Sequence, residues 1–129
     1  PGRGDPFELD EEKHRRLNAY AAVVLKNARL ELAMAQGQRN NTLVSVAFRL
    51  ARYAVVGLLT QGDIEEALLF ACSADGNQLI QDDGESAFWA TVRSGYEAGL
   101  RNPQDLQALW WRLEQTSRYS PTDSEPAGS

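Results

Sequence analysis

The segment richest in binding chemistry is Gly37-Gln38-Arg39-Asn40-Asn41-Thr42, which leads into an apolar helical pattern. A glycine turn, a base and two amide side chains predict a helix N-terminus here, capped by Asn40 or Asn41. Unpaired backbone N–H groups and the positive end of the helix dipole make such a terminus an anion site. The same residues also fit a helix that is simply capped, with Arg39 exposed, and spacing alone does not choose between the two.

The expected helix carries further basic residues. Ser45, Arg49 and Arg52 stand at i, i+4 and i+7, so we expect them to share one face opposite an apolar stripe. Two exposed arginines that continue from the cap along one side would follow the phosphates of a nucleic acid strand. The competing interpretation is that Arg49 and Arg52 pair with acidic residues of 60–92 and hold the fold together.

A second segment, Thr91-Val92-Arg93-Ser94-Gly95, is followed four residues later by Gly99. Each glycine costs about 1 kcal/mol in a helix interior, so this spacing needs a physical reason. One reason is close approach of a neighbouring helix, and the other is access of a ligand to the backbone beside Arg93 and Ser94. Trp89, one turn before Arg93, would either pack in the core or stack on a base.

Catalytic constellations are missing from the sequence. There is no glycine-rich phosphate loop with Lys and Ser/Thr, and no Gly-x-Ser-x-Gly elbow. The single histidine, His14, is expected to be solvated on a helix, and the single cysteine, Cys72, to be a small core residue. Helix capping accounts for two acidic pairs that could otherwise bind a divalent cation, Asp63 with Glu65 and Asp82 with Asp83. We therefore expect no catalysis by this chain alone, and no intrinsic metal or cofactor.

Charge is distributed unevenly along the 129 residues. The net charge is −5, yet residues 13–59 hold eight basic residues against Glu31 alone, and residues 60–92 hold seven acidic residues and no Lys or Arg. Such an asymmetry attracts polyanions, or it lets two parts of one molecule attract each other. One cysteine suits a reducing compartment, and neither a membrane span nor a signal peptide stands out. We expect a cytoplasmic protein in a bacterial host, with no membrane partner.

Hydrophobic residues recur with a helical period almost everywhere, which predicts an all-α bundle of about five helices with short loops. The first is expected at about 10–36, capped by Asp10, and the second from 41 or 42 to 56. The third, at about 64–74, has a capping box of Thr60 and Asp63. The fourth begins at a box of Asp82 and Glu85 and ends near residue 100. The fifth has Pro103 in its first turn.

The bundle is expected to span residues 10–119, between a loose segment 1–9 and a disordered tail or linker 120–129. Leu79 and Ile80 should anchor a loop at 77–83 to the core. Trp110 and Trp111 are adjacent and cannot share a face, so one should pack inside while the other meets solvent or a partner. Because the chain begins with Pro1 rather than Met, we expect it to be a fragment of a longer protein.

In their order, these segments resemble the helical domain that follows the catalytic core of bifunctional DNA primase-polymerases of plasmids, phages and actinobacterial prophages. The resemblance covers about residues 18–103 and rests on Gly37-x-Arg39-Asn40-x-x-Leu43 together with Thr91-Val92-Arg93-Ser94-Gly95. Further matches lie at 19–21, Leu25, 47–50, 57–58, 67–71, Glu85, Gly99 and Pro103. The chain departs from the family at Val44-Ser45, where a polar Asn-Arg pair is expected, and in a longer and more polar 75–84 loop.

The resemblance implies a non-catalytic helix-bundle domain of a DNA primase or primase-helicase, acting in phage or plasmid DNA replication. Such a domain helps bind the single-stranded DNA template and an ATP-like nucleoside triphosphate for primer initiation. The catalytic carboxylates and Mg would belong to an upstream primase-polymerase domain of the same chain, with a helicase domain as a further possible partner. The candidate DNA- and nucleotide-binding residues are Arg39, Asn40, Asn41, Arg49, Arg52, Arg93 and Ser94.

The alternative is a structural or protein-docking module that links a primase core to a helicase. Salt separates the two hypotheses, because a template-binding domain loses affinity steeply as salt rises, whereas a docking module binds no oligonucleotide even at low salt. A helix-turn-helix regulator fits less well, since no short recognition helix pair stands out.

Overall fold

The computed structural model describes residues 8–118, and all regular structure in that range is helical. This confirms the all-α prediction and adds one short helix to the five expected. The helices are α1 Glu11–Ala33, α2 Arg39–Ala54, α3 Gln61–Ala71, α4 Leu79–Asp83, α5 Glu85–Leu100 and α6 Leu106–Arg118. Of the predicted loose segment 1–9 only residues 8 and 9 are described, and the predicted tail 120–129 lies outside the described residues.

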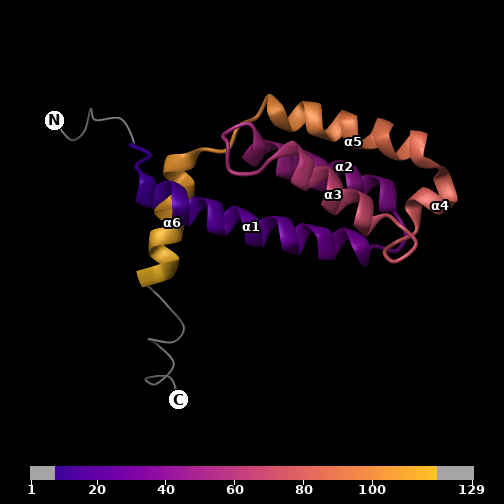
Figure 1. Ribbon diagram of the computed structural model, residues 1–129, viewed down its shortest axis with the longest axis horizontal. Coiled ribbons are helices and arrows are strands. Elements are labelled where there is room, and N and C mark those ends of the chain that lie inside the picture. The colour runs from indigo at the N-terminus through magenta and orange to yellow at the C-terminus, as the bar shows by residue number, and fades with distance from the viewer. Residues whose placement is uncertain (1–7, 119–129) are drawn as a thin grey trace, which may run out of the picture.

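The helices α1, α2, α3 and α5 run along the long axis of the molecule, with α4 at one end (Figure 1). α2 packs against α5 more extensively than any other two helices pack, and α1 packs mainly on α3. α6 lies across the N-terminal half of α1 (Figure 1). The central position of α2, between α1 and α5, decides the surroundings of its side chains.

Local capping explains where α1 and α3 begin, as predicted. The Asp10 carboxylate accepts a hydrogen bond from the Lys13 N–H at 2.8 Å. The Thr60 hydroxyl accepts one from the Asp63 N–H at 3.1 Å. α1 ends at Ala33, three residues before the expected end, with Met34 as its C-cap.

The N-terminus of α2 differs from the prediction. Gly37 and Gln38 both adopt left-handed backbone conformations, with φ of 68° and 52°. These two turns reverse the chain early, so α2 starts at Arg39, with Gln38 rather than Asn40 or Asn41 at the N-cap. No side chain caps this end, and the Asn41 side chain instead donates to the Gln38 side-chain oxygen at 2.9 Å.

The connection from α3 to α5 also differs from the expected loop. Residues Leu79–Asp83 form the short helix α4, which places Leu79 in the core, as predicted, and packs Ile80 against its edge. Gly84, with a φ of 94°, separates α4 from α5 and occupies the N-cap of α5. The predicted capping box of Asp82 and Glu85 is therefore wrong, because α4 uses Asp82 within its own turn.

Asn77 holds this connection in place, a role that its position in the sequence does not indicate. Its buried side-chain amide donates to the Leu32 carbonyl at the end of α1, at 2.8 Å, and its side-chain oxygen accepts from the Leu79 N–H, also at 2.8 Å. Its backbone N–H donates to the Ala71 carbonyl at the same distance. The side chain and backbone of this one residue thus join the ends of α1, α3 and α4.

Gly95 and Gly99 lie where α5 meets α2. A Cβ atom at Gly95 would overlap the Val44 carbonyl oxygen, and one at Gly99 would overlap the Phe48 carbonyl oxygen. The two helices run parallel in backbone contact, since later residues of α5 meet later residues of α2. Close helix approach, the first of the two predicted reasons, therefore explains the four-residue spacing of these glycines.

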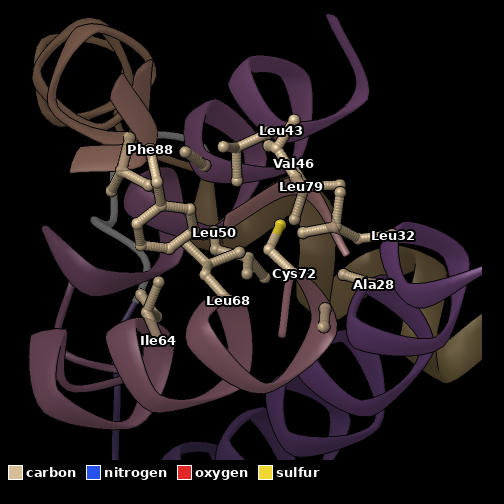
Figure 2. Packing of buried hydrophobic residues seen from close by; sticks show 13 residues of the cluster. Ala28, Leu32, Leu43, Val46, Leu50, Ile64, Leu68, Cys72, Leu79 and Phe88 are labelled. Carbon is tan, nitrogen blue, oxygen red and sulfur yellow. The ribbon is translucent and has the colours of Figure 1, made fainter. Parts of the chain in front are cut away.

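The core consists of two hydrophobic clusters. The larger lies between the first five helices and contains Phe88, Leu50 and Cys72 (Figure 2). Cys72 is fully buried, as predicted, and burial raises the pKa of its thiol to about 11. A buried thiol of this kind is a poor nucleophile and a packing residue.

The smaller cluster attaches α6 to the bundle. Its buried residues are Leu17, Ala21, Tyr53, Leu58 and Leu109. Trp110 packs against this cluster while Trp111 is 61% exposed, which confirms the predicted division between the two tryptophans. Pro103 lies before α6 rather than in its first turn, and the Asp105 carboxylate accepts from the Ala108 N–H at 3.1 Å.

Candidate nucleic-acid and nucleotide site

The N-terminus of α2 opens onto a hollow of about 420 Å³. The α1–α2 turn supplies Gly37, Gln38, Arg39 and Asn40, while Asn77, Leu79 and Asp83 close the other side. Because no side chain caps α2, the first backbone N–H groups of the helix remain available at this end. The hollow therefore offers backbone N–H donors to an anion, which is one of the two alternatives that the sequence leaves open for this segment.

Two acidic residues of α4, Asp82 and Asp83, bind the side chains of Arg39 and Asn40. The Arg39 guanidinium donates to the Asn77 carbonyl at 2.6 Å and forms an ion pair with Asp82 at 2.8 Å. The Asn40 amide donates to the Asp83 carboxylate at 3.3 Å. Arg39 is thereby fixed in position with its side chain 25% exposed, and Asp83 puts a negative charge in the lining of the hollow.

The expectation that Arg49 and Arg52 are both free along α2 is wrong, because each already has a partner within the molecule. Arg49 pairs with Glu31 of α1 at 2.9 Å, and the Arg52 Nε donates to the Asn102 carbonyl after α5 at 2.7 Å. Both side chains are half-buried rather than free. Both α1 and α5 lie beside α2, so side chains on its remaining face come within reach of these two neighbours. Arg49 reaches toward α1, and Arg52 reaches toward the end of α5. Intramolecular pairing, the competing interpretation, applies here, although neither partner lies in 60–92.

Arg93 and Ser94 are exposed on α5. Gly95, the next residue, is pressed against Val44 of α2, so the backbone that carries Arg93 and Ser94 is held firmly. Trp89 packs on the core edge-to-face with Phe88, with ring centroids 4.9 Å apart. This contact makes Trp89 a packing residue, the first of its two predicted roles.

Opposite charges from the basic and acidic parts of the sequence lie around one hollow between α1 and α3. Lys26 and Arg29 of α1 line one hollow of about 430 Å³ together with Asp63 and Glu66 of α3. The Arg29 guanidinium also lies 5.2 Å from the centre of the Phe70 ring. Opposite charges thus face each other where α1 packs on α3. This arrangement fits the second of the two interpretations of the uneven charge, in which two parts of one molecule attract each other.

The remaining candidates have structural surroundings. His14 is half-buried rather than fully solvated, with a ring nitrogen 3.4 Å from the Asn18 amide. The Asp63 N–H is bound by the Thr60 cap, and Glu65 accepts from Gln61 at 2.8 Å. Within residues 8–118, no group of three or more His, Cys, Asp or Glu could hold a metal ion. In the same range, no helix is long and apolar enough to cross a membrane.

Comparison with known proteins adds no relative to these observations. No protein family, curated protein or solved structure matches this chain.

Proposed function

We propose that this chain is a non-catalytic helix-bundle domain of a DNA primase or primase-helicase. In this role it helps to bind single-stranded template and a nucleoside triphosphate for primer initiation, while catalysis and its Mg belong to a primase-polymerase domain of the same parent chain. The proposal rests on the resemblance carried by Gly37-x-Arg39-Asn40 and Thr91-Val92-Arg93-Ser94-Gly95.

The observation that carries the proposal is the location of these two motif segments on α2 and α5, the helices held in backbone contact. Gly95 meets Val44, which follows Arg39 by about one and a half helical turns. The hollow at the start of α2 and the exposed Arg93 and Ser94 therefore belong to one rigid pair of helices. A rigid pair can hold two ligands at a constant separation, as the first step of primer synthesis requires.

The two parts suit different ligands. In the hollow, backbone N–H groups at the positive end of α2 and the fixed Arg39 would receive the phosphates of a triphosphate. The exposed Arg93 would contact the phosphate backbone of the template. Arg49 and Arg52 take structural roles in this arrangement, because both are bound within the molecule.

The second candidate, a module that docks other proteins, is favoured by the same internal pairing. Arg39, Arg49, Lys13 and Arg15 each form an ion pair within the chain, which reduces the positive field available to DNA. Measurement of DNA binding separates the candidates.

Template binding is tested with a labelled 20-nucleotide single strand by fluorescence anisotropy. We expect a micromolar or weaker Kd that weakens steeply between about 50 and 200 mM salt, as for non-specific binders. Arg93→Glu should weaken binding roughly tenfold, since it replaces attraction to a phosphate with repulsion. The matched control Arg112→Glu alters an exposed arginine on α6 and should change the affinity little. Absence of binding at low salt, or equal losses in both variants, would refute template binding and leave the docking module.

Triphosphate binding is tested with ATP by isothermal titration calorimetry. Asp83→Asn removes the carboxylate that lines the hollow and keeps a side chain of the same size, so we expect ATP to bind about three- to tenfold tighter. Asp82 stays in place to hold Arg39. The control Asp75→Asn removes an exposed carboxylate outside the hollow. An unchanged or weaker affinity for Asp83→Asn would exclude the hollow as the phosphate site.

A further inference from the structure

The helix α6 crosses the N-terminal half of α1 (Figure 1). A groove lies between these two helices. It encloses about 550 Å³. Tyr20 and Val23 of α1 and Leu109 and Leu113 of α6 contribute to its lining. It lies on other elements than the α2 hollow, and nothing in the proposed DNA or nucleotide role uses it.

The groove is preformed, because its floor is part of the core. Leu109 is 1% exposed and belongs to the cluster that attaches α6 to α1. At one edge the Arg16 guanidinium lies 4.9 Å from the centre of the Trp110 ring, a contact that holds both side chains in place. A partner would therefore meet a rigid surface and would lose little free energy to ordering it.

The dimensions suit a short helix. Arg16, Tyr20 and Val23 stand at i, i+4 and i+7 on α1, a stripe about 10 Å long. Val23 is 53% exposed even though the neighbouring lining is apolar. Two turns of an amphipathic helix, with apolar residues at i, i+3 and i+4, would cover this stripe and bury Val23.

The charge of the groove indicates the sign of the charge that its occupant should carry. Among the described residues of the lining, the two charged ones, Arg16 and Arg112, are both cationic, and none is an Asp or Glu. Arg112 is exposed and makes no ion pair or side-chain hydrogen bond with any residue between 8 and 115. We propose that the groove between α1 and α6 binds an acidic amphipathic helix of a partner polypeptide, whose apolar face contacts Val23 and Leu113 and whose carboxylates pair with Arg16 and Arg112.

The test uses a labelled 14-residue helical peptide with leucines at i, i+3, i+4 and i+7 and glutamates on its flanks, titrated with the full 129-residue chain. We expect saturable binding that weakens as salt rises. Val23→Asp should weaken it at least tenfold, and Arg112→Glu about three- to tenfold. The matched controls are Leu30→Asp, another exposed apolar residue of α1 that does not line the groove, and Arg93→Glu on α5. Both controls should bind the peptide like the unaltered chain.

Two further arms decide between sources of binding. A peptide of the same apolar pattern with lysines in place of glutamates should bind at least tenfold more weakly. Sedimentation velocity on the chain alone measures self-association. Equal binding of both peptides, or unchanged binding to Val23→Asp, would overturn the proposal. The chain could also form a dimer that Val23→Asp disrupts but that the acidic peptide does not dissociate. That result would overturn the proposal and would indicate that the groove binds a second copy of this chain. Because Arg93→Glu and Arg112→Glu exchange roles as variant and control between the DNA and peptide tests, each proposal can fail separately.

Discussion

Gly99→Ala is expected to lower the free energy of unfolding by roughly 2 kcal/mol, although alanine is the better helix former. The new methyl group would overlap the Phe48 carbonyl oxygen and press on the Ala51 Cβ. Neither is the flexible end of a long side chain, so α5 must move away from α2, and overpacking of this kind costs about 1–3 kcal/mol or more. That cost outweighs the gain of about 1 kcal/mol from helix propensity.

Gly95 meets α2 in the same way, so we expect the double variant Gly95→Ala with Gly99→Ala to lose roughly 4 kcal/mol. A loss of this size approaches the whole stability of a small domain and should lower the Tm by more than about 10 °C. The matched control is Gly62→Ala in α3, where a Cβ meets no atom within 4 Å and stability should stay equal or rise. Thermal melts followed by circular dichroism measure all three. Stabilisation by Gly99→Ala would contradict the backbone contact between α2 and α5.

Asn77→Ala is expected to cost about 3 kcal/mol in a urea unfolding experiment. The side chain is 9% exposed and satisfies two backbone groups, the Leu32 carbonyl and the Leu79 N–H. Both groups would lose their partner in a buried place, and each such loss costs about 1–3 kcal/mol. Exposed Asn27 of α1 is the control, and Asn27→Ala should change stability by no more than about 0.5 kcal/mol.

Asn77→Asp keeps the shape of the side chain and makes the effect depend on pH. The ionised carboxylate would still accept from the Leu79 N–H, but it would face the Leu32 carbonyl with no proton to donate. Folding therefore favours the protonated form and raises the pKa of the introduced carboxyl above its unfolded value near 4. The hydrogen bond from the protonated carboxyl to the Leu32 carbonyl therefore stabilises the fold fully at a pH below the unfolded pKa, and this stabilisation is lost as the pH rises through the folded pKa. The free energy of unfolding of the variant should therefore approach that of the unaltered chain as the pH falls. A difference between the two that does not change with pH would contradict the donated hydrogen bond.

Features that depend on neighbours along the chain could be predicted from the sequence. The helical period identifies the all-α fold, and the caps at Asp10 and Thr60 lie within three residues of the N–H groups they bind. The core positions of Cys72 and Leu79 follow from the apolar faces of their segments. The glycine spacing at 95 and 99 signalled a close approach, although not the identity of the helix that approaches.

The N-caps of α2 and α5 differ from the predicted ones for a physical reason. Polar residues in favourable cap positions do not cap when the backbone turns earlier, as it does at Gly37 and Gln38, or when a glycine takes the cap, as at Gly84. Instead of capping the backbone of α2, the Asn40 side chain donates to Asp83, which lies 43 residues away. Competition among distant hydrogen-bond partners is decided by packing, and local propensity contains no information about it.

The chain's own sequence thus determined the helices, the two local caps and the apolar residues that form the core, because each depends on contacts within one or two turns. The tertiary structure alone decided the partners of Arg39, Arg49 and Arg52. Arg39 meets Asp82, Arg49 meets Glu31 and Arg52 meets the Asn102 carbonyl, through contacts that span 18 to 50 residues. A long cationic side chain on a helix surface takes whichever acceptor the crossing of its neighbours brings within reach, and that crossing is determined by the shape of the packed apolar faces.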